Sequence, residues 1–199
     1  MSFRAACIQN SATPDVAHDI AVLARLIRDA AAQGAGFVAT PEYCAGLDTR
    51  DGLLYPVAPE EKDHPVLPAM AALASELGIW LLIGSIGVRA ADGRINNRSY
   101  MLRPDGGIAA RYDKIHMFDV DLGGGESYME SANYEPGRQA VVASLPWGQI
   151  GLTICYDLRF PHLYRALARA GAKFLSVPAA FTRPTGIAHW HTLLRARAI

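Results

Sequence analysis

The sequence has few cysteines, no long apolar run and no excess of charge. Its three cysteines, Cys7, Cys44 and Cys155, are an odd number without a CxxC pair, which disfavours a disulfide scaffold or structural zinc site and favours a reducing cytoplasm. Apolar runs such as residues 79–83 are far shorter than the ~20 residues that cross a bilayer. Its 19 basic and 19 acidic side chains cancel, so no charge excess favours nucleic acid or an anionic membrane as a partner.

What is present is an apolar chain of suitable size for one domain. The 199 residues are 51% hydrophobic, enough to bury a sizeable core. No repeat, low-complexity tract or charge block divides them. We therefore expect residues 1–199 to form a single domain.

An amphipathic helix, a glycine and a strand follow one another three times along the chain. The helices are predicted at 16–30, 66–77 and 163–170, the glycines are Gly34, Gly78 and Gly171, and the strands are predicted at 36–40, 79–86 and 173–177. This order is typical of an α/β fold.

The remaining pattern is rich in strands. Further strands are predicted at 3–9, 96–103, 108–112, 139–144 and 149–154, the last two as a hairpin. Cys7 falls within the alternation of the first strand and is expected in the core. Residues 119–136 have weak periodicity and three consecutive glycines, which predicts a long surface loop, a frequent place for functional residues.

Three of the predicted strands end beside a side chain that can perform acid–base or nucleophilic chemistry, namely Glu42, Lys114 and Cys155. If these strands lie side by side in one sheet, the three side chains meet at its carboxyl edge, where α/β proteins bind ligands. The ammonium of Lys114 and a following helix N-terminus would lower the pKa of the Cys155 thiol. Glu42 could move the thiol proton, while Lys114 and backbone N–H groups after the cysteine could stabilise an oxyanion.

The segments around these residues resemble the three catalytic signatures of the nitrilase, or carbon–nitrogen hydrolase, superfamily. They are Pro41-Glu42, the segment YDKIH at 112–116 and the segment CYDLRFP at 155–161. The resemblance covers essentially the whole chain. It implies Glu42 as general base, Lys114 as oxyanion stabiliser and Cys155 as nucleophile. Glu130 matches the family's second glutamate better than Glu126 does, with the role of positioning Lys114 and tuning its charge.

Residues closer to the C-terminal end resemble one branch of this superfamily. Residues 180–182 and 193–199 are similar to the deaminated glutathione amidases, whereas ω-amidases usually differ at Thr182 and at 195–197. The resemblance implies a cytoplasmic thiol amidase that cleaves the C–N bond of a small carboxylate-bearing amide, with deaminated glutathione as the expected substrate. The nearest alternative is ω-amidase action on α-keto acid amides. An alternative of another class is a non-catalytic nitrilase-like module for binding or assembly.

The resemblance also implies an architecture and an assembly. The fold would be the nitrilase-like α-β-β-α sandwich, and the protein would be a homodimer or a higher homo-oligomer that needs no cofactor. Family members extend beyond the segment at 193–199, so we expect the C-terminal part of the sandwich to be missing after residue 199.

Several side chains near these motifs admit more than one interpretation. The backbone N–H of Tyr156 is expected to help Lys114 hold the oxyanion. Arg159 either binds a substrate carboxylate or pairs with Asp157.

His116, Asp119 and Asp121 could be drawn as a metal cluster, but their spacing fits no strong ligand motif, so no metal site is expected. Cys44 is the fallback nucleophile.

Overall fold

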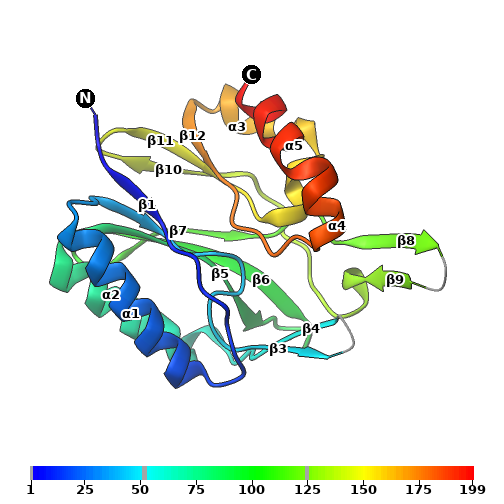
Figure 1. The fold of residues 1–199 in the computed structure, drawn as a ribbon, viewed down its shortest axis with the longest axis horizontal. Coiled ribbons are helices and arrows are strands. Elements are labelled where there is room, and N and C mark those ends of the chain that lie inside the picture. The colour runs from blue at the N-terminus through cyan, green and yellow to red at the C-terminus, as the bar shows by residue number, and fades with distance from the viewer. Residues whose placement is uncertain (1, 51–52, 124–125) are drawn as a thin grey trace.

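Two β-sheets packed face to face form the centre of the protein. The computed structural model describes residues 2–50, 53–123 and 126–199 (Figure 1). The larger sheet has the order β1-β2-β5-β6-β7 and the smaller one β10-β11-β12. Their strands are β1 (Ala5–Cys7), β2 (Phe37–Ala39), β5 (Trp80–Arg89), β6 (Ile95–Leu102), β7 (Ile108–Asp113), β10 (Val141–Leu145), β11 (Gly148–Leu152) and β12 (Ala172–Ser176).

Helices cover the outer face of each sheet, which gives the predicted α-β-β-α layers. The helices are α1 (Val16–Ala32), α2 (Val66–Leu77), α3 (Pro161–Arg169), α4 (Arg183–Thr185) and α5 (His191–Ala198). Buried residues of α1 and α2, such as Leu23 and Met70, form one core with Val38 and Leu81 of the larger sheet. Leu167 of α3 belongs to a second core, next to the smaller sheet. Figure 1 shows the two helical layers on opposite sides of the sheets.

The layer between the sheets is apolar and positions the site. Phe37, Leu82 and Met101 of the larger sheet form one cluster with Leu145 and Leu152 of the smaller sheet. Because each buried side chain of this size contributes about 1.5–3 kcal/mol, the two sheets are held in a fixed relation. The carboxyl ends of β2 and β11 are thereby fixed relative to each other.

The predicted loop at 119–136 is wrong in part. Residues 119–132 contain a hairpin, β8 (Asp119–Gly123) and β9 (Glu126–Met129), followed by the 3₁₀ turn η2 (Glu130–Ala132). Gly124 and Gly125 lie outside the described residues. In the sequence, Val120 and Leu122 alternate with two aspartates, but this period-2 signal is short and the neighbouring glycines conceal it. A second hairpin, β3 (Leu47–Arg50) and β4 (Leu53–Pro56), was not predicted.

Cys7 is exposed, so its predicted place in the core is wrong. Among the strands that the structure describes, β1 lies at the edge of the larger sheet and pairs with β2 alone. Ala6 packs against the helical layer, whereas Ala5 and Cys7 project from the opposite face of the strand. The alternation was therefore correct, but it shows only which residues share a face and not which face is covered.

Candidate active site

The three predicted side chains meet between the sheets and not along one sheet. Glu42 follows β2, and Lys114 directly follows β7, both in the larger sheet. Cys155 follows β11 of the smaller sheet and begins the 3₁₀ turn η3 (Cys155–Arg159). The three strands do not share one sheet, so the packing of one sheet of the sandwich on the other brings the residues together. All three line one pocket.

Lys114 lies between two carboxylates. Its Nζ donates to both oxygens of Glu130, at 2.8 and 2.9 Å, and lies 3.5 Å from Oε1 of Glu42. Lys114 is 3% exposed. Burial lowers the pKa of the ammonium, but the charges of Glu42, Cys155 and Glu130 outweigh burial and raise this pKa. Lys114 therefore remains a cation at the centre of the site.

Hydrogen bonds fix both glutamates. Asn97 donates to Oε1 of Glu42 at 2.8 Å, and the backbone N–H of Ala180 donates to Oε2 at 2.7 Å. The N–H of Phe118 donates to Glu130 at 2.6 Å. Burial raises the pKa of Glu130, against the lowering effect of Lys114. Asn97 and Ala180 were not predicted as site residues, since only the folded chain brings them to Glu42.

Cys155 stands on a strained turn. Its φ is +49°, in the left-handed region that disfavours residues with a Cβ, and its N–H donates to the carbonyl of Pro178 at 2.8 Å. Tyr43, with φ +48°, is the other non-glycine residue of the described chain in this region, and both line the pocket. Such strain is typical of functional positions.

The pKa of the Cys155 thiol lies well above its ordinary value, which contradicts the predicted lowering. Burial is the main cause, and the charge of Glu42 together with a hydrogen bond to Glu42 adds to it. Lys114 acts in the opposite direction but is shared by two carboxylates. The resting cysteine is therefore a thiol whose proton faces a base, and a proton transfer must accompany its attack.

Asp157 anchors the turn that carries Cys155. Its fully buried carboxylate accepts hydrogen bonds from the N–H of Ile154 at 2.9 Å and from the hydroxyl of Tyr112 at 2.6 Å. The backbone N–H and ring Nδ1 of His116 also contact it, at 3.1 and 2.7 Å. Groups from two segments of the chain, residues 112–116 and Ile154, thus hold the Asp157 carboxylate in place.

Arg159 is free to face a ligand. The alternative in which it pairs with Asp157 is not observed, and no carboxylate pairs with it within the described ranges. Its guanidinium lies 5.7 Å from the ring centres of both Tyr156 and Phe181, and it contacts His189 at 3.2 Å. Arg159 lines the pocket that contains Cys155.

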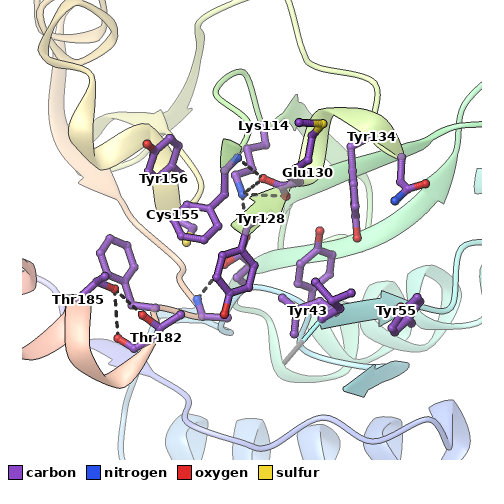
Figure 2. A pocket seen from close by; sticks show the side chains of 18 of the residues that line it. Tyr43, Tyr55, Lys114, Tyr128, Glu130, Tyr134, Cys155, Tyr156, Thr182 and Thr185 are labelled. Carbon is purple, nitrogen blue, oxygen red and sulfur yellow. Dashed lines mark hydrogen bonds and ion pairs between the residues drawn. The ribbon is translucent and has the colours of Figure 1, made fainter. Parts of the chain in front are cut away.

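The pocket has two ends. It holds about 990 Å³ of space, part of it open to solvent. In Figure 2, Cys155, Thr182 and Thr185 lie on one side of Lys114, and Tyr43 and Tyr134 lie on the other. These tyrosines and Thr185 were not predicted as site residues. No local sequence signal identifies them, because they line the pocket only after the hairpins and turns are in place.

The alternative chemistry at neighbouring residues finds no support in the geometry. Among the residues that the structure describes, no group of three potential ligands is placed to hold a metal ion. His116 contacts Asp157 and stacks on Phe160 at 3.7 Å. Cys44 is 1% exposed, and burial raises its pKa to about 11. Within the described ranges, none of the helices has the length and apolar character that a membrane crossing requires.

The fold is that of the carbon–nitrogen hydrolases. The carbon–nitrogen hydrolase family matches residues 4–199, so the chain belongs to this family and the predicted resemblance is confirmed. A deaminated glutathione amidase of Yersinia enterocolitica is 46% identical over 145 residues, which cover 71% of this chain and 51% of that protein. The omega-amidase NIT2 of Homo sapiens is 36% identical over all of this chain and 71% of its own length.

A solved structure shows the same fold. It is a variant of the amidase from Nesterenkonia sp. AN1 in which the acetamide moiety of fluoroacetamide is attached covalently to the active-site cysteine. It is 25% identical, with a TM-score of 0.79, and the match covers 99% of this chain and 72% of that one. The chain thus spans between half and three quarters of the proteins described here.

Proposed function

We propose that the protein is a thiol amidohydrolase that cleaves the C–N bond of a small carboxylate-bearing amide. The observation that carries the proposal is the buried Glu42–Lys114–Glu130 group beside the strained Cys155 turn. The covalent acetamide on the cysteine of the Nesterenkonia amidase supports the assignment of the nucleophile. In this proposal Cys155 is the nucleophile, Glu42 the general base and acid, Lys114 the oxyanion stabiliser and Glu130 the residue that positions Lys114.

The first half of the reaction forms a thioester. The sulfur of Cys155 attacks the amide carbonyl carbon while Glu42 takes the thiol proton. The carbonyl oxygen becomes an oxyanion, which the Lys114 ammonium and the backbone N–H of Tyr156 stabilise. The C–N bond then breaks, and Glu42 passes its proton to the departing nitrogen. The products of this half are a neutral amine and an acyl group on Cys155.

The second half returns the enzyme to its resting state. A water molecule attacks the thioester carbonyl, and Glu42 takes a proton from this water. The second oxyanion collapses, the C–S bond breaks, and the sulfur recovers a proton from Glu42. The sum of the two halves is amide plus water giving carboxylic acid plus amine, with no change in the protein. No cofactor takes part in this cycle.

The expected substrate is deaminated glutathione. Arg159, which has no carboxylate partner within the described chain, would bind a carboxylate of the acyl part, and Tyr156 would form the adjoining wall. The Yersinia relative supports this assignment. The similarity to the human omega-amidase favours a second candidate, the hydrolysis of α-keto acid amides to release ammonia. The two candidates differ in the amine that leaves.

Three further properties complete the proposal. We place the protein in the cytoplasm, since three free cysteines, one of them exposed, suit a reducing compartment. We take residues 1–199 as one domain.

We expect a homodimer or higher homo-oligomer, because Ile187 is 77% exposed and α5 has no fully buried residue. Light scattering after size-exclusion chromatography measures the subunit number.

Rapid-quench mass spectrometry of the intact protein tests the mechanism. After mixing with deaminated glutathione or an ω-amide, we expect a transient mass increase equal to the acyl group. Cys155→Ala, the matched control, must show no increase. Absence of both adduct and product with the native protein would instead favour the non-catalytic module.

A further inference from the structure

The outer part of the pocket is apolar and open to solvent. Within the described ranges, seven large apolar or aromatic side chains are exposed, and four of them, Leu53, Leu54, Tyr55 and Met129, line the pocket that contains Cys155. Their exposed fractions run from 37% at Leu54 to 70% at Met129. We call these four residues the apolar rim. A ligand that enters the pocket can therefore touch them directly.

The packing of the protein does not explain the apolar rim. Leu53, Leu54 and Tyr55 belong to β4, which pairs with β3 in a two-stranded sheet, and Met129 ends β9, which pairs with β8 in another. None of the four belongs to the three apolar clusters of the described core. Apolar side chains that stay in water add nothing to the stability of the fold. A group of them at a pocket is typical of a surface that binds an apolar partner or ligand.

The apolar rim extends the pocket beyond the reacting groups. Lys114 is 3% exposed at the centre of the site, whereas Tyr55 is 47% exposed. In Figure 2, Tyr55 lies on the side of Lys114 opposite to Cys155 and Tyr156. The pocket therefore has a buried charged part, where the chemistry takes place, and an exposed apolar part beside it.

The position of Arg159 decides which half of an amide reaches the apolar rim. Its guanidinium lies 5.7 Å from the ring centre of Tyr156, on the Cys155 side of the pocket. A carboxylate of the acyl part bound there, with the amide carbonyl carbon at the sulfur of Cys155, fills that side. The bond from this carbon to nitrogen then points past Lys114. The group attached to the nitrogen is the part that meets the apolar rim.

We infer that the apolar rim is a subsite for an apolar substituent on the amide nitrogen of the substrate. This inference rests on the proposed amidase function and extends its substrate class to amides of apolar amines, such as alkylamines. An alkyl chain and the side chains of the rim remove one another from water. Each methylene group of the chain should therefore tighten binding about twofold to fourfold.

Binding to the Cys155→Ala protein tests the subsite without turnover. The matched ligands are the N-propyl and the N-(2-hydroxyethyl) monoamides of glutaric acid. They share one acyl group and one chain length, and they differ only in a terminal methyl against a terminal hydroxyl. We expect the N-propyl amide to bind about tenfold more tightly, because only the hydroxyl loses hydrogen bonds to water at the rim. Isothermal titration calorimetry measures both dissociation constants.

Polar substitutions in the apolar rim should remove this preference. Leu53 and Met129 are exposed, so the double variant Leu53→Ser/Met129→Gln in the Cys155→Ala protein should keep the fold. We expect its two dissociation constants to agree within about twofold. Val57→Ser is the matched control, since Val57 directly follows β4 and is 40% exposed but does not line the pocket. It must leave the tenfold ratio unchanged.

The other possible occupant of the apolar rim is a second copy of this chain. Light scattering after size-exclusion chromatography compares the subunit number of the double variant with that of the native protein. Equal subunit numbers support the ligand subsite. A smaller subunit number in the double variant would show that the rim is covered by the second copy, and the subsite would then be abandoned.

The outcomes separate the subsite from the proposed function. Similar affinities for the two amides, an unchanged ratio in the double variant, or no binding of either amide would overturn the subsite. If the native protein hydrolyses neither these amides nor deaminated glutathione, the proposed function fails, while a tenfold ratio in the Cys155→Ala protein still supports the subsite. If the native protein hydrolyses the amides and binds them equally, the function stands and the subsite fails.

Discussion

The hydroxyl of Tyr112 donates a 2.6 Å hydrogen bond to the buried carboxylate of Asp157. Tyr112 lies two residues before Lys114, and Asp157 lies two residues after Cys155. Burial, followed by the charge of Asp157, raises the pKa of Tyr112 far above its ordinary value, so the phenol remains a donor. The bond therefore joins the segment of the proposed oxyanion stabiliser to the turn of the proposed nucleophile.

Tyr112→Phe tests whether this bond positions the site. We expect the free energy of unfolding to fall by about 1.5–3 kcal/mol, the cost of losing a buried hydrogen bond to a charged group. We expect kcat to fall about tenfold with little change in KM, because the nucleophile is displaced while the binding walls remain. Urea denaturation and steady-state kinetics measure the two effects. A loss of stability with unchanged kcat would show that the bond only supports the fold.

Removing the charge of Glu130 tests its role toward Lys114. In Glu130→Gln the ammonium loses two charge-assisted hydrogen bonds and is left with Glu42 at 3.5 Å. We expect kcat to fall about 10²–10³-fold, as for the loss of an oxyanion donor. Glu60→Gln is the matched control, since Glu60 pairs with the exposed Lys62 far from the chemistry. Similar kcat values for the two variants would contradict the role of Glu130.

The three cysteines should differ in reactivity with a bulky disulfide reagent. Cys7 is exposed, Cys44 is buried, and Cys155 lies in the pocket with a raised pKa. We expect one thiol to react quickly in the native protein and two more only after unfolding. Cys7→Ser should abolish the fast phase. A fast phase that survives this substitution would mean that Cys155 is an accessible thiolate.

Glu61 should make stability depend on pH. Arg111, Arg98 and Tyr100 bond its carboxylate and lower its pKa, although burial acts in the opposite direction. Since the folded state binds a proton on Glu61 less readily than the unfolded state, this stabilisation is present above the ordinary pKa and is lost as pH falls through the lowered pKa. Glu61→Gln should therefore cost about 1–2 kcal/mol at pH 7 and progressively less in acid. A cost independent of pH would contradict the assignment.

The sequence predicted which short segments meet in the pocket. The motifs around Glu42, Lys114 and Cys155 are local, and each follows a strand that periodicity reveals. The sheet to which a strand belongs is not local, so strand periodicity alone did not show that Cys155 follows a strand of the other sheet, although the resemblance implied the two-sheet sandwich. Which face of β1 is covered, and so the exposure of Cys7, is likewise decided by distant segments. The raised pKa of the Cys155 thiol is set first by burial and then by the charge of Glu42, and both depend on the folded surroundings.

The hydrogen-bond partners of the site residues could not be predicted from the sequence either. Asn97 meets Glu42 because β6 adopts one register on β5, and Ala180 meets it across 138 residues of sequence. Tyr43 adjoins Glu42 in the chain, yet it lines the pocket together with Tyr134, which is distant in the sequence. A local sequence pattern therefore identifies the motif residues more readily than the distant residues that surround them in the pocket.

The left-handed backbone at Tyr43 and Cys155 has a consequence for directed evolution. Glycine or asparagine would adopt this conformation at lower energy, so a library selected for heat resistance alone would enrich these two residues at Cys155. At Tyr43 the loss of a buried aromatic ring outweighs the relief of strain. Variants recovered at Cys155 would be more stable and would lack the proposed nucleophile, so selection at high temperature must be coupled to turnover.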